Sequence, residues 1–169
     1  MFKVIRKEKS NGVFQFPSTI LKQVSEDVEI PISDPEITKV VEKLVDWEEK
    51  HPKSQGLSAV QLGVAKRIAV IRMNGKLMTI VNPKLLCKFG SQMSNEGCHS
   101  LNEDRYVLRR NTSGLLKYYD VNGLARYIWL NKKYIRLIQH ELDHMDGILI
   151  NEKGTHYNAN SDSGNITKS

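Results

Sequence analysis

Residues 139–147 read QHELDHMDG, and this stretch governs the interpretation of the whole chain. His140 and His144 lie four positions apart, and Glu141 directly follows the first histidine. On a helix, residues i and i+4 are neighbours on one face, so the two imidazoles can bind one metal ion with the glutamate beside it as a general base. The pattern predicts a hydrolytic metal site, which needs a third protein ligand and one open position.

The same motif has a plain alternative, in which two core histidines are satisfied by the backbone and the glutamate is there by chance. The surrounding residues predict a helix from about Asn131 to Gly147, because apolar side chains recur at helical spacing. The histidines lie at one edge of this apolar arc and face the protein, whereas Arg136 and Asp143 are expected to point away. The arc consists of Tyr134, Leu137, Ile138, Leu142 and Met145.

The third ligand can be sought on either side of this helix. Downstream, one extended form of the motif requires a histidine where this chain has Ile150, and Glu152 and His156 are poorly placed. Upstream, Cys98 lies in the stretch NEGCHS and offers a thiolate. A Cys-His-His set leaves the fourth position of a tetrahedral site open, so Cys98 is the better candidate, although an ordinary buried cysteine is the alternative.

Composition restricts the setting in which such a site would work. The chain has 169 residues and two cysteines, and Cys87, which lies in the stretch KLLCK outside the motifs described above, is interpreted as structural. No apolar leader or membrane-length stretch is present, so we expect a cytoplasmic protein with free thiols and no membrane partner. The net charge of +6 permits an anionic partner, but basic residues do not alternate with aromatics, which favours a solvated surface and no specific nucleic acid.

The remaining patterns predict a single α+β domain. Asp34-Pro35 begins a helix with apolar residues at helical spacing, and His51-Pro52 ends it. Hairpins are expected over residues 67–81 and 115–130. We therefore expect antiparallel or mixed sheets packed around a central HExxH-bearing helix, plus the N-terminal helix. Residues 1–150 would form the catalytic domain, and residues 151–169 a polar, mobile tail.

Taken together, these residues resemble those of the peptide deformylases. GLSAVQ at 56–61 is similar to the family's G-L-A-A-x-Q, EGCHS at 96–100 to E-G-C-L-S, and QHELDH at 139–144 to Q-H-E-x-D-H. The three motifs occur in the family's order, and the resemblance covers residues 17–152. Weaker matches link the motifs at Leu62-Gly63-Val64, Val81-Asn82-Pro83, Arg105 and Arg110.

The chain also departs from the family pattern at positions that concern the substrate cleft. The metal ligands and the glutamate are retained, so the departures leave the expected hydrolytic chemistry in place while altering the lining of the cleft. They are Ser54 for a glycine and Ser58 for an alanine around the first motif, His99 for a leucine in the second, Asn102 for a proline after it, and Lys132 and Lys133 for a glycine and a leucine before the helix.

The resemblance implies a metal-dependent hydrolase that removes the formyl group from formyl-methionine during co-translational N-terminal processing of nascent polypeptides. Cys98, His140 and His144 would hold the metal, which in this family is Fe2+, replaceable by Zn2+, Ni2+ or Co2+. Glu141 would take a proton from the attacking water and pass it to the leaving amine.

Further site residues are implied by the same resemblance. The side-chain amide of Gln61 and the backbone N–H of His99 would stabilise the oxyanion, while Glu96 paired with Arg110 would hold the Cys98 loop. The peptide would pair with the first motif as an added strand, and its methionine would enter a pocket beside that motif. The expected substrate-binding residues are Gln55, Gly56, Leu57, Ser94 and Leu137.

Two other functions remain open, and one partner is implied. A metallopeptidase of another type is disfavoured because a downstream ligand is missing. A divergent homologue with an altered acyl substrate or a non-catalytic binding role is motivated by His99, Asn102 and Lys133. Besides N-formylated nascent peptides, the resemblance implies the ribosome near its exit tunnel as a partner, with which the positive charge is compatible.

Overall fold

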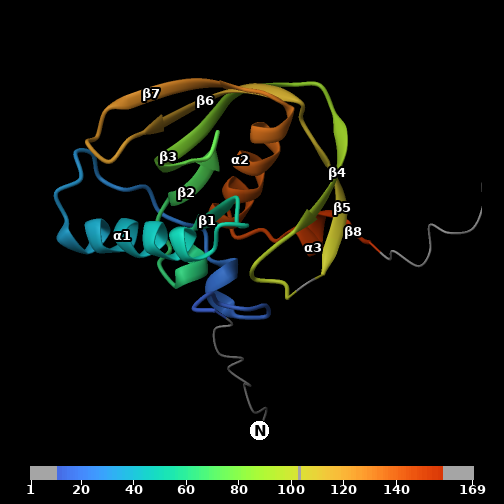
Figure 1. The fold of residues 1–169 in the computed structure, drawn as a ribbon, viewed down its shortest axis with the longest axis horizontal. Helices are drawn as coiled ribbons and strands as arrows, with labels where there is room; N and C mark the ends of the chain where they lie inside the picture. Colours follow the sequence, from blue (N-terminus) through green and yellow to red (C-terminus); the bar gives the residue numbers. More distant parts are fainter. Residues whose placement is uncertain (1–10, 103, 158–169) are drawn as a thin grey trace, which may run out of the picture.

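A computed structural model describes residues 11–102 and 104–157 of the protein (Figure 1). It has the α+β architecture that the sequence predicts. The helices are the 3-10 helices η1 (Thr19–Lys22) and η2 (Ala59–Leu62) and the α-helices α1 (Pro35–Lys50), α2 (Lys132–Met145) and α3 (Ile150–Lys153). The strands are β1 (Gly56–Ser58), β2 (Ile68–Met73), β3 (Lys76–Phe89), β4 (Gln92–Gly97), β5 (Arg105–Arg110), β6 (Ser113–Tyr119), β7 (Ala125–Leu130) and β8 (Thr155–His156).

The strands form two antiparallel sheets. The larger sheet has the order β1-β2-β3-β6-β7, and the smaller one has the order β4-β5-β8. The two predicted hairpins are confirmed as β2–β3, which turns at Asn74-Gly75 with both residues at positive φ, and β6–β7. Every pairing between these strands is antiparallel, so the mixed pairing that the sequence left open is not found among them.

Helix α1 packs beside the larger sheet and ends near the first motif. Its N-terminus is capped by the Asp34 side chain, which accepts the N–H of Glu36, and Pro35 occupies the first turn. Apolar residues at helical spacing, from Ile37 to Trp47, pack against β1 and β2 in one core cluster. The last turn therefore brings Trp47 and its buried neighbour Glu48 close to the chain that leads into β1.

Helix α2 lies between the two sheets (Figure 1). The Asn131 side chain accepts the N–H groups of Lys133 and Tyr134 and caps the helix, close to the expected start. One side packs apolar residues against the larger sheet. The smaller sheet covers another side, where Asp143 is 7% exposed and bonded to Arg110, so the expectation that this acid points away was wrong. Helical periodicity alone gives no information about which sheet covers a polar position.

The fold continues beyond the boundary expected at residue 150. Ile150 is buried at the start of α3, and β8 pairs with β5 through Tyr106–His156 and Val107–Thr155. Residues 151–157 therefore do not belong to a tail, because backbone pairing holds a segment that lacks apolar periodicity. The rest of the expected tail, residues 158–169, lies outside the described residues. No helix of the described residues has the length and apolar character needed to span a membrane.

Candidate metal centre and its cavity

Cys98, His140 and His144 converge at one point between the two sheets. The ligand atoms of the three side chains all lie within 4.8 Å of one another, and Cys98 Sγ is 3.2 Å from His144 Nε2. Helix α2 supplies both imidazoles, and the thiol comes from the residue that directly follows β4. The downstream candidates lie elsewhere, because Glu152 pairs with Lys22 and His156 stacks edge-on against Tyr106. Cys98 is thus the residue that the fold brings to the histidine pair.

The donor atoms of this cluster suit a divalent transition metal, and their proton affinities are strongly shifted by one another. Burial raises the pKa of the Cys98 thiol, but His144 and His140 lower it more, so the net pKa lies well below the ordinary thiol value. Burial lowers the pKa of His140, whereas hydrogen bonds with Cys98 and Glu96 hold it well above its ordinary value. A thiolate beside two imidazoles is the donor set that zinc and ferrous sites use, so the residues fit the group.

A buried ionic network lies behind His140. The His140 Nδ1 atom is 3.0 Å from Glu96 Oε2, which leaves Nε2 for the metal side. Arg110 donates two hydrogen bonds of 2.9 Å to Glu96 and one of 2.6 Å to Asp143. Burial raises the pKa of Glu96, but its bonds to His140 and Arg110 lower it to about 2. The Glu96–Arg110 pair is present as expected, and Asp143 is an addition that sequence reasoning missed.

Glu141 is held by a residue that departs from the family pattern. Its carboxylate is 2% exposed, and its Oε2 accepts a 2.6 Å hydrogen bond from the hydroxyl of Ser58. The other oxygen faces Gly56, where an added Cβ would lie 2.9 Å from Oε1. Sequence reasoning treated Ser58 only as a departure, because its partner is 83 residues away. The glutamate therefore has one oxygen fixed and one directed at the backbone of β1.

Gln61 is oriented from both ends of its amide. Its Oε1 accepts the backbone N–H of Ser58 at 3.0 Å, and its Nε2 donates to Ser100 Oγ at 3.1 Å. The same Nε2 lies 3.9 Å from Cys98 Sγ, so the amide N–H group is adjacent to the metal ligands. With an exposure of 2%, Gln61 is a fixed element of the site rather than a surface loop residue.

Two departures from the family pattern contact each other. The His99 Nε2 atom is 3.1 Å from Ser54 Oγ, although the residues are 45 positions apart. The Ser54 hydroxyl donates to buried Glu48, so it accepts from His99. The His99 ring also meets Trp47 edge-on, and burial lowers its pKa while it raises the pKa of Glu48. A chain of polar contacts thus joins buried Glu48 at the end of α1 to His99 in the Cys98 loop.

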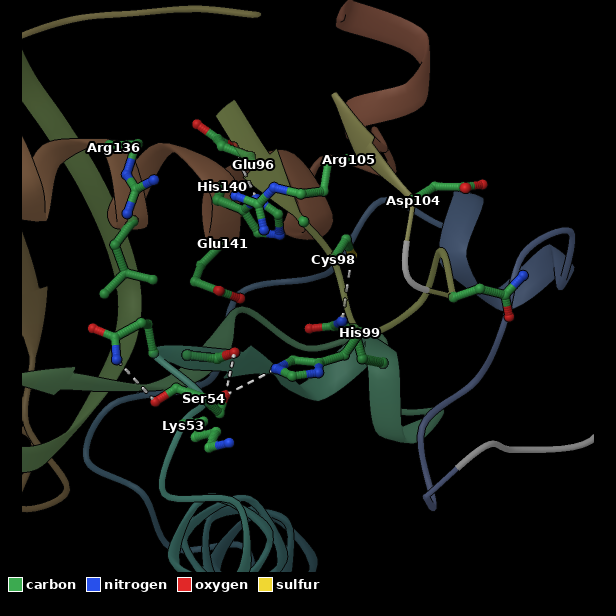
Figure 2. A pocket seen from close by; sticks show the side chains of 16 residues that line it. Lys53, Ser54, Glu96, Cys98, His99, Asp104, Arg105, Arg136, His140 and Glu141 are labelled. Atoms are coloured by element: carbon green, nitrogen blue, oxygen red, sulfur yellow. Dashed lines mark hydrogen bonds and ion pairs between the residues drawn. The ribbon is translucent and has the colours of Figure 1, made fainter. Parts of the chain in front are cut away.

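These groups line a cavity of about 450 Å³ (Figure 2). Among the expected substrate-binding residues, Gln55, Gly56 and Leu137 line it. Leu57 and Ser94 are buried and are not among the lining residues. Most of the lining side chains are polar. They include the departures Ser54 and Asn102 and four residues that the sequence did not connect with substrate: Lys53, Asp104, Arg105 and Arg136.

Comparisons with known proteins agree with this geometry. The family model described as polypeptide deformylase matches residues 11–159. The peptide deformylase of Thermodesulfovibrio yellowstonii is 32% identical over 144 residues, which cover 82% of this chain and 86% of the relative. That of Finegoldia magna is 34% identical over 138 residues, covering 79% and 83%. The Plasmodium falciparum peptide deformylase, solved in complex with an inhibitor, superposes with a TM-score of 0.75 at 30% identity and covers 85% of this chain and 88% of that one.

Proposed function

This chain belongs to the polypeptide deformylase family of metal-dependent enzymes, which remove N-formyl groups from nascent polypeptides, and we propose that Cys98, His140 and His144 hold its metal. The convergence of these three ligand atoms within 4.8 Å carries the proposal. We propose Fe2+ as the metal, exchangeable with Zn2+, Ni2+ or Co2+, because a thiolate with two imidazoles accepts each of them. When bound, the metal supplies a water of lowered pKa and a positive charge beside the formyl oxygen.

Glu141 is proposed to be the group that moves the proton. Its carboxylate is excluded from bulk water, and it reaches the cavity beside His140. Because Ser58 holds Oε2, Oε1 is free to take a proton from the attacking water and to pass it to the leaving amine. Ser58 would therefore act as a positioning residue that fixes the direction of this transfer.

The oxyanion is proposed to form between Gln61 and the backbone of His99. The Gln61 amide is fixed by Ser58 and Ser100 next to Cys98. Among the described residues, the backbone N–H of His99 has no acceptor, although the carbonyl of the same residue accepts from Gln15. A preorganised N–H without a partner is suited to an oxygen that becomes negative during the reaction.

The peptide is proposed to bind along β1 as an added strand. This strand is an edge of the larger sheet, with β2 as its one neighbour, so the opposite edge can accept a peptide backbone. Gln55, Gly56 and Leu57 would supply that backbone, and the first side chain would enter the cavity beside Leu137. Ser94 is buried and is not among the lining residues, so we propose that it supports the pocket from behind.

The setting is proposed to be the cytoplasm, where N-formylated chains emerge from the ribosome near its exit tunnel. The net charge of +6 is compatible with contact to an anionic ribosomal surface. We also propose that the described residues act as one catalytic domain, with α2 as the central element that joins both sheets to the metal.

The chain offers a matched test, because it has two cysteines. Formate release from formyl-Met-Ala-Ser and metal content would be measured on anaerobically prepared, Fe2+-loaded protein, with Cys98→Ala, Cys87→Ala and Glu141→Ala variants. Cys87 lies on β3 opposite Leu115, outside the cavity, so its variant should keep both metal and activity. Cys98→Ala should lose both, and Glu141→Ala should keep the metal and lose activity by about a thousandfold.

Two results would contradict the assignment. Full activity in Cys98→Ala would exclude the thiol as a ligand. A metal-loaded parent that releases no formate would remove the catalytic role of this chain and favour a binding role instead.

A further inference from the structure

Arg136 lies on the face of α2 that carries the metal ligands. It precedes His140 by four residues, which corresponds to one helical turn and a rise of about 6 Å along the axis. Its side chain lines the same cavity as Glu141 and Leu137. Figure 2 shows it on the opposite side of the cavity from Asp104, with His140 and Glu141 between them. The sequence analysis expected Arg136 to point away, but the side chain lies within one turn of the reacting centre.

Arg136 differs from the other shielded arginines of the described residues because it has no acidic partner. The others all contact acids: Arg67 contacts Asp146, Arg72 contacts Glu48, and Arg110 contacts Glu96 and Asp143. Arg136 is half-buried as well, yet within residues 11–102 and 104–157 it makes no ion pair or hydrogen bond. A guanidinium presents five donors in a planar fork that matches a carboxylate, and shielding it without a partner is costly. The donors of Arg136 are therefore available to a ligand.

The acids of the cavity do not neutralise this cation. Glu96 is bound to Arg110 and His140, and one oxygen of Glu141 is bound to Ser58. The third acid of the lining, Asp104, lies 3.5 Å from His156 Nε2, on the side of the cavity opposite Arg136 (Figure 2). A second cation of the lining, Arg105, donates to the side chain and carbonyl of Asn95 and has no acidic partner among the described residues. The cavity thus contains two arginines without an acidic partner among the described residues, and this favours an anionic ligand beside them.

Polar side chains outnumber apolar ones in the lining. Leu137 is its one large apolar side chain, and Gln55 lies beside it on the chain that enters β1. A methionine side chain that entered this end would meet Leu137 on one side and amide and guanidinium groups on the other, which recovers only part of the free energy of apolar burial. A carboxylate at the same place would instead pair with Arg136.

We propose that Arg136 forms a carboxylate-binding subsite, so that the preferred formylated substrate carries a carboxylate within a few ångströms of its formyl group. The proposal rests on the proposed deformylase function, because it concerns the substrate of the same site. The carboxylate has two possible sources. It is either an acidic side chain on the formylated residue or the free C-terminal carboxylate of a very short formyl peptide, and both present the same fork-shaped acceptor to the guanidinium.

The test compares substrates that differ in one charge. Formate release by the metal-loaded protein would be measured with amidated formyl-Glu-Ala-Ser and formyl-Gln-Ala-Ser, and with formyl-Met-Ala as free acid and as amide. The parent should prefer the charged member of at least one pair by roughly 10- to 100-fold in kcat/KM. A preference in the tripeptide pair identifies the side chain as the source, and a preference in the dipeptide pair identifies the C-terminus.

Two arginine variants make the test specific. Arg136→Leu should abolish the charge preference, whereas Arg109→Leu should retain it, because Arg109 is an exposed β5 residue that donates to Ser91 outside the cavity. Binding of the product peptides Glu-Ala-Ser amide and Gln-Ala-Ser amide, and of Met-Ala as free acid and as amide, would be followed by calorimetry on the metal-loaded protein. This second readout needs no turnover.

The outcomes separate the two proposals. Release from neutral formyl-methionyl peptides without any charge preference, and equal binding of the charged and neutral products, would overturn the carboxylate subsite and leave the deformylase function intact. No release from any formyl peptide would overturn the function. In that case, Arg136-dependent binding of a charged product would still support the subsite, and equal binding would overturn it.

Discussion

The charged side chains at the two ends of the cavity differ in whether they have partners within the protein. At the inner end, Glu96, Arg110 and Asp143 form a closed network behind the metal ligands, in which each charge has a partner within the protein. The outer end, by which we mean the rest of the lining, contains Arg136 on one side and Arg105 on the other (Figure 2). Among the described residues, Arg136 has no partner, and Arg105 contacts the amide and the carbonyl of Asn95 but no acid.

This difference in pairing corresponds to two roles, namely holding the metal-binding side chains in place and binding a ligand. A closed network fixes the position of its members and holds the His140 ring in one orientation, which a metal site requires. Charges without internal partners contribute less to folding but remain available to a ligand. The inner end of the cavity is therefore built to position the chemistry, and the outer end to select the substrate.

Breaking the inner network should have the largest effect. Glu96→Gln removes a buried carboxylate whose pKa is lowered from 4.5 to about 2, and such a shift corresponds to roughly 3 kcal/mol of stability at neutral pH. Because the folded pKa is depressed, this contribution is present above pH 4.5 and is lost as the pH falls through about 2. Urea unfolding of the metal-free protein at several pH values would measure both effects.

The pH profile distinguishes this explanation from simple loss of packing. The parent should lose stability steeply between pH 4.5 and 2, and Glu96→Gln should lack that part of the slope. The exposed α1 acid Glu42 provides the control, because Glu42→Gln should leave the profile unchanged. Parallel profiles for the parent and Glu96→Gln would contradict the prediction.

Adding a methyl group at Gly56 should perturb Glu141 while the network of Glu96, Arg110 and Asp143 stays intact. It therefore tests the cavity separately from the network. The added Cβ would lie 2.9 Å from Glu141 Oε1 and 3.1 Å from Leu137 Cδ1, so the carboxylate must move. We expect kcat to fall about tenfold or more in Gly56→Ala, since small misplacements of a catalytic group are costly. Metal content and the unfolding midpoint should change little, and a large drop in either would show that the residue acts through the fold instead.

Removing the contact between Ser54 and His99, which both line the cavity, should have the smallest effect, measured as a change in the free energy of unfolding. A double-mutant cycle with Ser54→Gly and His99→Leu would measure their coupling in urea unfolding. We expect about 1 kcal/mol, because the residues share one part-buried hydrogen bond in a polar chain that ends at Glu48. The double variant should then be more stable than the sum of the single changes predicts. Strictly additive effects would show that the two departures are independent.

The sequence predicted the parts of the site that local chemistry specifies. Ligand type and spacing led to Cys98 and the histidine pair, and the capping residues Asp34 and Asn131 lie next to the observed starts of α1 and α2. The Asn74-Gly75 turn identified the first hairpin for the same reason, because positive φ is a property of the residues in the turn itself.

The strands β4 and β5 escaped prediction because their buried face is polar. Ser94 and Glu96 point inward on β4, and Leu108 and Arg110 point inward on β5. Alternation of apolar and polar residues, which identifies a half-buried strand, is therefore missing where the strands carry the inner network. The alternation of apolar and polar residues is thus absent at the positions whose side chains support the candidate metal ligands.

By itself, then, the sequence determined the helix starts, the hairpins and the set of candidate metal ligands, because each depends on residues close in the chain or on the ligand chemistry of a few side chains. The tertiary structure alone decided that Ser58 holds Glu141, that Ser54 meets His99 and that Arg136 faces the cavity without a partner. These facts depend on which element covers which face, and contacts between residues tens of positions apart leave no periodic trace in the sequence.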